Sequence, residues 1–99
     1  MFLAKSSRKH YEKYKKVCSE QLFNKIIKLK KKDISQYVKL EKKICGIIND
    51  PFHNYKFLRH DLKKFNRVHL GHFVLIFFID HKNKQIIFGD YAHHDEIYL

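Results

Sequence analysis

Histidines and an arginine in the second half of the chain are the residues whose type and spacing could do chemistry. Arg67 and His69 stand two positions apart just before Gly71, and His93 and His94 are adjacent near the end of the chain. The unperturbed pKa of an imidazole is close to neutral, so a histidine can donate or accept a proton, and an arginine suits a phosphate group. We therefore look for a functional site where the fold brings these side chains together.

The same histidines could also bind a metal, but their spacing is poor for that purpose. Adjacent residues of an extended chain, such as His93-His94-Asp95, point to opposite sides, and no third ligand is placed by the spacing. We expect no metal and no other cofactor. Three further histidines are expected on the solvated surface: His10, His53 and His81.

These candidate residues lie next to an apolar segment, which should form the strand that positions them. Residues 73–79 are seven apolar residues without a break, rich in aromatic and β-branched side chains and too short to cross a bilayer, which predicts a central strand. Gly71-His72 suits a two-residue turn before it, and residues 81–84 are a polar loop of hairpin length after it. We expect a three-stranded antiparallel meander.

These turns predict the register and the two faces of the sheet. His69 should face Val74, and Phe77 should face Phe88. The same register puts Tyr91 opposite Val74. Because opposite residues share a face, the core face should hold Val68, Leu70, Phe73, Leu75, Phe77, Ile79, Ile86 and Phe88. The other face, here called the mixed face, should hold Arg67, His69, Val74, Ile76, Phe78, Gly89 and Tyr91.

The first half of the chain predicts a strand and two helices. Residues 14–18 form a weakly patterned strand that would pair with an edge of the meander. Ser19 suits the N-cap of one helix, and Asp33 with Gln36 resembles a capping box that begins another, ended by Asn49-Asp50-Pro51. The short break predicts an antiparallel pair packed on the core face. Their core-facing residues should be Leu22, Phe23, Ile26, Ile27, Leu29, Ile34, Tyr37, Val38, Ile44, Cys45 and Ile48.

Composition and charge limit the classes of function that this chain could have. The 99 residues carry a net charge of +11, which indicates a polyanionic partner. Residues 1–13 are a basic arm that predicts no particular element, and residues 14–99 are one domain. Cys18 and Cys45 lie in apolar patterns, so we expect both buried in a reducing cytoplasm. No signal peptide or membrane-spanning segment is expected.

Several segments in this order resemble the RelE/ParE superfamily of toxins from toxin–antitoxin modules, and most of all its YafQ-type RelE members. They are Asn49-Asp50-Pro51, Asp61-Leu62-Lys63-Lys64-Phe65, Arg67-Val68-His69, the Gly71 turn, Ile79-Asp80 and His93-His94-Asp95-Glu96-Ile97-Tyr98. The resemblance covers residues 14–98. It implies an α+β fold in the order β-α-α-β-β-β, with the first strand and the helix pair packed on one face of a small antiparallel sheet. An extended piece around residues 55–58 precedes the meander.

The resemblance also implies an activity. RelE-type toxins are metal-independent endoribonucleases that cut mRNA on the ribosome: the 2′-hydroxyl attacks the adjacent phosphate and leaves a 2′,3′-cyclic phosphate. The expected partners are an antitoxin, a small and acidic protein, together with ribosome and mRNA, and no membrane. Two alternatives stay open: a ParE-type inhibitor of DNA gyrase, and an inactive relic that binds nucleic acid or antitoxin.

Residue roles follow from matching the family pattern. His94 matches a general acid, His69 a base or orienting group, and Tyr98 an aromatic residue that stacks on a base. Lys56 stands where YafQ-type toxins have another histidine. Apart from the family pattern, Arg67 should face phosphate because its register puts it on the mixed face. The RNA-binding residues would be His60, Lys63, Lys64, His72, Phe73 and Tyr91. Many RelE members have arginine at the position of Val74 and in the C-terminal motif, so only a histidine-based site is possible here.

Overall fold

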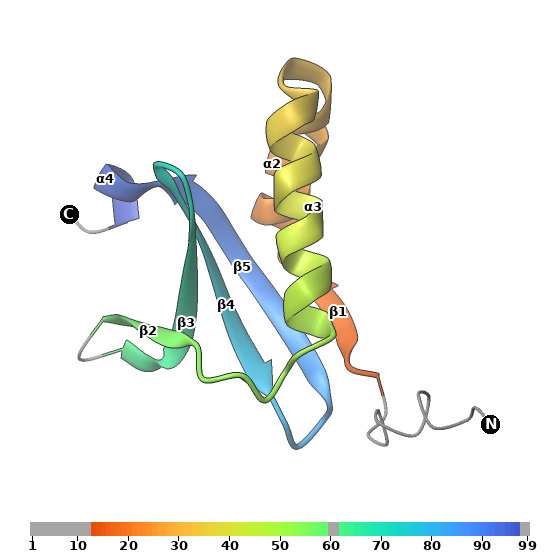
Figure 1. The fold of residues 1–99 in the computed structure, drawn as a ribbon, viewed down its shortest axis with the longest axis vertical. Coiled ribbons are helices and arrows are strands. Elements are labelled where there is room, and N and C mark those ends of the chain that lie inside the picture. Colours follow the sequence, from red (N-terminus) through yellow and green to blue (C-terminus); the bar gives the residue numbers. More distant parts are fainter. Residues whose placement is uncertain (1–12, 60–61, 98–99) are drawn as a thin grey trace.

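The structure is a computed structural model that describes residues 13–59 and 62–97, and it has an α+β fold (Figure 1). Its elements are β1 (Lys15–Cys18), α2 (Glu20–Lys32), α3 (Ile34–Ile48), β2 (Lys56–Arg59), β3 (Leu62–Leu70), β4 (Phe73–Asp80), β5 (Gln85–His93) and α4 (His94–Ile97). The expected order of strand, helix pair and meander is confirmed. Two elements are additional: β2 forms from the extended piece, and the short α4 follows the meander.

Some predictions concern parts of the chain that the structure does not describe. These are the predictions for residues 1–12 of the basic arm, for His60 and for Tyr98. The side chain of Lys63 also lies outside the described part, although its backbone belongs to β3.

The five strands form one sheet in the order β1-β5-β4-β3-β2. The first strand pairs with β5 in parallel, with Lys15 beside Gln85, so the sheet is mixed rather than wholly antiparallel as expected. The long connection through the helices and the meander permits this parallel pairing. The helix pair lies over the β1 and β5 side of the sheet and projects beyond it at the α2–α3 end (Figure 1).

Both predicted helix caps are present. The Ser19 hydroxyl accepts a hydrogen bond from Leu22 N at 3.1 Å and donates one to Gly89 O at 2.6 Å. The carboxylate of Asp33 accepts from Gln36 N at 3.1 Å. The first cap therefore also ties the start of α2 to β5.

The core lies between the helix pair and the sheet. Its fully or nearly fully buried residues are Leu22, Leu40, Ile44, Ile47, Leu75, Phe77, Ile86 and Phe88. Leu40 and Ile47 were not among the predicted core positions, whereas Phe23 and Ile34 were predicted there and are 55% and 58% exposed. Ile34 is the first residue of α3, at the end of the helix pair that projects beyond the sheet (Figure 1). Cys45 is exposed, contrary to the prediction, and Cys18 is partly buried.

A β-bulge changes the predicted register of the last strand. The β3–β4 pairing is as predicted, with His69 beside Val74, and Phe77 pairs with Phe88. The register then shifts at Gly89, so that Val74 pairs with Ala92 rather than with Tyr91. Tyr91 therefore turns to the core face, where it is 5% exposed.

The mixed face is partly covered at the end that carries α4. This helix follows β5 directly and contacts β4 and β5. Val74, predicted as an exposed residue of this face, is fully buried there, while Ile76 and Phe78 stay partly exposed. Among the described residues, no helix is long and apolar enough to span a membrane.

Candidate functional site

Two imidazoles from distant parts of the chain lie next to each other on the mixed face. His69, on β3, and His94, the first residue of α4, have ring centroids 5.8 Å apart and planes 30° apart. The His94 backbone N–H donates to His72 O at 2.8 Å, which anchors the start of α4 to the β3–β4 turn. The fold therefore brings together the two histidines that the resemblance singled out.

Arg67 lies beside His69 on the same face of β3. Its Nη1 is 3.1 Å from His69 Nε2, and its Nε donates to Phe57 O at 3.0 Å. A guanidinium can only donate hydrogen bonds, so Nε2 of His69 is the acceptor in this contact. Lys56 pairs with Arg67 across the β2–β3 ladder, which places a second cation at the site.

The surroundings of His69 favour its neutral form. Desolvation is the largest cause that lowers the pKa of its imidazole, followed by the charges of Arg67, His94 and Lys56. A positive charge on the ring would be repelled by the adjacent guanidinium and ammonium groups. A neutral imidazole with an unprotonated nitrogen can accept a proton at neutral pH.

Two further histidines stand beside this pair, at the turn. The rings of His72 and His93 are 6.1 Å apart and nearly parallel, and Phe73 meets His93 edge-on at 5.5 Å. His93 was noted beside His94 in the sequence but was assigned no role at the site. Phe73 is less available than expected, because its ring stacks on Tyr91 at 5.0 Å and packs against the core.

Two predicted RNA-binding residues lie elsewhere. Tyr91 belongs to the core face, where its hydroxyl accepts a hydrogen bond from Gln36 Nε2 at 2.5 Å, so the prediction that it lies on the mixed face is wrong. Lys64 lies further along the sheet, with its Nζ 5.6 Å from the ring centroid of Phe78. Within the described part of the chain, no three His, Cys, Asp or Glu side chains are grouped so that they could hold a metal ion.

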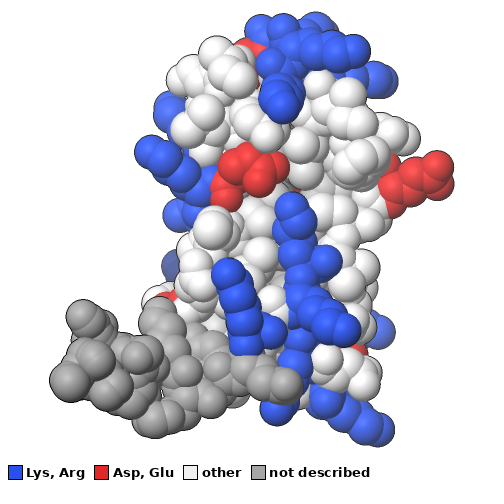
Figure 2. All heavy atoms as spheres, turned by 90° about the vertical axis from the view of Figure 1, so that its right-hand side faces the viewer, with Lys and Arg blue, Asp and Glu red and all other residues white. Residues whose placement is uncertain are grey.

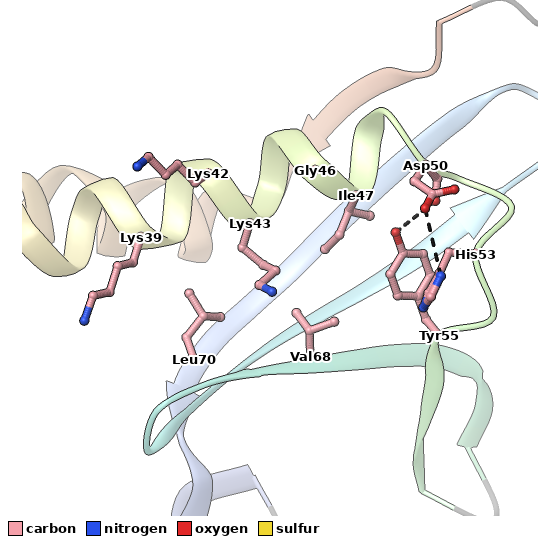
Figure 3. A pocket seen from close by; sticks show the side chains of 10 residues that line it. All are labelled: Lys39, Lys42, Lys43, Gly46, Ile47, Asp50, His53, Tyr55, Val68 and Leu70. Atoms are coloured by element: carbon pink, nitrogen blue, oxygen red, sulfur yellow. Dashed lines mark hydrogen bonds and ion pairs between the residues drawn. The ribbon is translucent and has the colours of Figure 1, made fainter. Parts of the chain in front are cut away.

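A groove lies on the opposite face of β3, beside α3 (Figure 3). Ile47, Val68 and Leu70 form apolar walls, and the groove has a volume of about 610 Å³. Its remaining lining residues are Lys39, Lys42, Lys43, Gly46, Asp50, His53 and Tyr55. The groove exists because the helix pair covers the β5 side of the sheet and leaves the core face of β3 open.

The polar end of this groove is held by one hydrogen bond and a longer histidine–carboxylate contact. The Tyr55 hydroxyl donates to Asp50 O at 2.8 Å, and His53 Nδ1 is 3.9 Å from the Asp50 carboxylate. Burial, with the nearby charge of Asp50, raises the pKa of Tyr55 to about 12. Val68 and Leu70 flank His69 along β3, so the groove and the histidine pair lie on opposite faces of one strand.

The sequence has relatives among archaeal proteins, although no family model matches it. The chain is 47% identical to RelE4 of Methanocaldococcus jannaschii, which is named as a toxin, over 72 residues that are 72% of this chain and 76% of that protein. It is 40% identical to an uncharacterized protein of Methanosarcina mazei over 79 residues, 79% of this chain and 91% of that one.

Two solved structures share the fold at low sequence identity. One is a chain of the toxin-antitoxin complex RelBE2 from Mycobacterium tuberculosis, with a TM-score of 0.67 and 16% identity over 83% of this chain and 99% of that chain. The other is the YoeB/ParE toxin from Agrobacterium tumefaciens, with a TM-score of 0.70 and 12% identity over 81% of this chain and 98% of that chain. At such identities the likeness is one of fold alone.

Proposed function

This chain belongs to the RelE/ParE superfamily of toxins from toxin–antitoxin modules, and we propose that it acts there as a metal-independent endoribonuclease that cuts mRNA on the ribosome. The observation that carries the proposal is the pairing of His69 with His94 beside Arg67. Two imidazoles and a guanidinium at one place are the groups needed for proton transfer at a phosphodiester and for holding its charge.

The proposed reaction uses the 2′-hydroxyl of the RNA as the nucleophile. Arg67 turns from His69 Nε2 to the phosphate, and neutral His69 then takes the proton of this hydroxyl at Nε2 as the hydroxyl oxygen attacks the adjacent phosphorus. His94 gives a proton to the 5′-oxygen as the bond between phosphorus and that oxygen breaks. The products are a 2′,3′-cyclic phosphate and a free 5′-hydroxyl. Arg67 and Lys56 stabilise the charge that builds up on the phosphorane.

The toxin role implies an antitoxin, which we propose is a small acidic protein that binds the groove between α3 and β3. The groove combines apolar walls with three lysines, Lys39, Lys42 and Lys43. An amphipathic segment with acidic residues beside its apolar anchors complements both features. The RelBE2 structure is itself a toxin-antitoxin complex, which supports a partner of this kind.

Induced expression of the chain in growing cells tests the proposed activity. We expect growth arrest with mRNA cleavage that primer extension maps to translated codons, and we expect His94→Ala to abolish both. Growth arrest by His94→Ala with intact mRNA would contradict the proposal. Gyrase-linked DNA breaks with continuing translation would instead indicate a ParE-type toxin.

A further inference from the structure

Four lysines gather at the end of the sheet opposite to the histidine pair. Lys13, Lys15, Lys82 and Lys84, together with Asn83, line a hollow of about 460 Å³ between β1 and the β4–β5 loop. Lys15 N donates to Lys84 O at 3.0 Å, so the backbone holds the two segments together. Among the described residues, no carboxylate lines this hollow.

The nearby acid of this loop makes hydrogen bonds within the loop. Asp80 accepts from Asn83 N at 3.1 Å and from Asn83 Nδ2 at 2.8 Å, and these bonds lower the pKa of its carboxyl. A hollow lined by lysine side chains favours a ligand that carries several negative charges. Phosphate groups along a nucleic acid are such a ligand.

This lysine cluster and the histidine pair share one face of the sheet. Lys15 pairs with Gln85 and Gln85 with Asp80, while His69 pairs with Val74, so Lys15 and His69 are both on the mixed face. The nine residues of β5 separate the loop from α4, a distance of roughly 30 Å at about 3.3 Å per residue. Viewed from the right-hand side of Figure 1, Lys and Arg side chains cover the top of the molecule as well as much of its lower half (Figure 2).

The surface between the two ends is apolar and carries a further cation. Ile76, Phe78 and Ile87 are partly exposed on the mixed face, and Lys64 stands over the Phe78 ring. Aromatic and aliphatic side chains flanked by cations suit single-stranded RNA, whose bases can stack while its phosphates meet the charges.

We infer that Lys13, Lys15, Lys82 and Lys84 form a second phosphate-binding site, which holds single-stranded RNA that runs along the mixed face from the histidine pair. This inference rests on the proposed function and extends it. The site would bind the substrate at a distance from the bond that is cut, so a short RNA would not reach it and a long one would.

Fluorescence anisotropy with labelled oligouridylates tests the inference. All proteins carry His94→Ala so that the RNA stays intact, and two lengths are compared, about 4 and about 12 nucleotides. The test variant adds Lys15→Gln and Lys82→Gln. The matched control adds Lys28→Gln and Lys31→Gln, which remove the same charge from exposed positions of α2.

We expect the loss of affinity to depend on the length of the RNA and on the salt concentration. The test variant should bind the long oligonucleotide about tenfold more weakly and lower the slope of log affinity against log salt by about 1.4, since each phosphate contact to a single strand contributes about 0.7. The short oligonucleotide should bind as before, and the control should bind both RNAs like its parent.

Two outcomes would overturn the inference. One is a test variant that matches the control in affinity and salt slope on the long oligonucleotide. The other is displacement of the RNA by duplex DNA at equal concentration, which would assign the surface to a different nucleic acid. Neither outcome depends on RNA cleavage. A failure of the proposed nuclease activity would instead appear in the expression experiment with the wild-type protein.

Discussion

The proposed chemistry depends on which of the two imidazoles carries a proton. His69 is crowded by Arg67, His94 and Lys56, and each of these charges, together with desolvation, lowers its pKa. His94 begins α4 on the rim of the site, where its ring is exposed. These surroundings suit His69 to accept a proton, and the proposed mechanism gives the role of proton donor to His94.

Arg67→Gln should therefore raise the pKa of His69 in the intact protein. The substitution removes the second largest cause that lowers this pKa and leaves the first, desolvation, in place. NMR titration of the imidazole should show the wild-type ring losing its proton below the ordinary value of 6.5 and the variant losing it at higher pH. Arg59→Gln, which removes the same charge from β2, should leave the titration unchanged. Equal titration curves for wild type and Arg67→Gln would contradict this reading of the site.

His94→Ala should lower the rate of mRNA cleavage by about 10²- to 10⁴-fold, the usual contribution of a general acid. The reason is that the leaving 5′-oxygen would lose its proton donor while the RNA could still bind. Single-turnover cleavage on programmed ribosomes measures the rate, and His53→Ala, at an exposed position on the helix side of the sheet, is the matched control. Cleavage within threefold of the wild-type rate would remove His94 from the mechanism.

Among the elements, the bulge in β5 decides which residues reach the mixed face. Ser19 Oγ donates to Gly89 O, and Lys25 Nζ binds the Asp90 carboxylate at 2.7 Å and Tyr91 O at 3.0 Å. These contacts join α2 to the strand just before the residues of the site. Through them α2 holds the bulged part of β5.

Ser19→Ala should lower the free energy of unfolding by about 1–2 kcal/mol, because it removes both the N-cap of α2 and the bond to Gly89 O. Chemical denaturation measures the loss. Ser35→Ala, at an exposed position in α3, should change the stability by less than about 0.5 kcal/mol. Equal stabilities of the two variants would show that this link contributes little.

The sequence predicted the β3–β4 hairpin well because its register follows from a local signal. Gly71 supplies the positive φ of 65° that the turn requires. The bulge was not predictable in the same way, because a glycine inside a strand is a weak signal. The side chains that bind this part of β5, Ser19 and Lys25, also come from a segment that is far away in the sequence. Tyr91 was misplaced for that reason, whereas His69, on β3, and His94, at the start of α4, lie next to each other as expected.

Over the whole molecule, the two faces of the sheet serve two purposes in our account. The mixed face carries the histidine pair at one end and the lysine cluster at the other, which suits RNA. The opposite face carries the apolar groove with its lysines, which suits an acidic protein segment. In our account the net charge of +11 attracts two anionic partners, RNA and an acidic protein segment. The sequence alone could not assign the basic residues to one partner or the other, because that assignment depends on which half of the sheet the helices cover.

Lys39→Glu with Lys43→Glu should weaken antitoxin binding at least tenfold, since both lysines line the groove and would then repel an acidic segment. The antitoxin to use is one identified by co-purification with this chain, and calorimetry measures the affinity. Lys28→Glu with Lys31→Glu, on the exposed side of α2, is the control with the same change of charge. If both double variants bind the antitoxin equally, the groove is not its binding site.

The central claim is that paired imidazoles cut RNA by means of its own 2′-hydroxyl, and analysis of the product ends tests it most directly. Purified protein is incubated with programmed ribosomes and mRNA, in parallel with an mRNA that carries a 2′-deoxy sugar at the mapped cleavage position. We predict 2′,3′-cyclic phosphate and 5′-hydroxyl ends on the normal mRNA and no cleavage at the deoxy position. Cleavage at the deoxy position, or products with 3′-hydroxyl ends, would contradict the account.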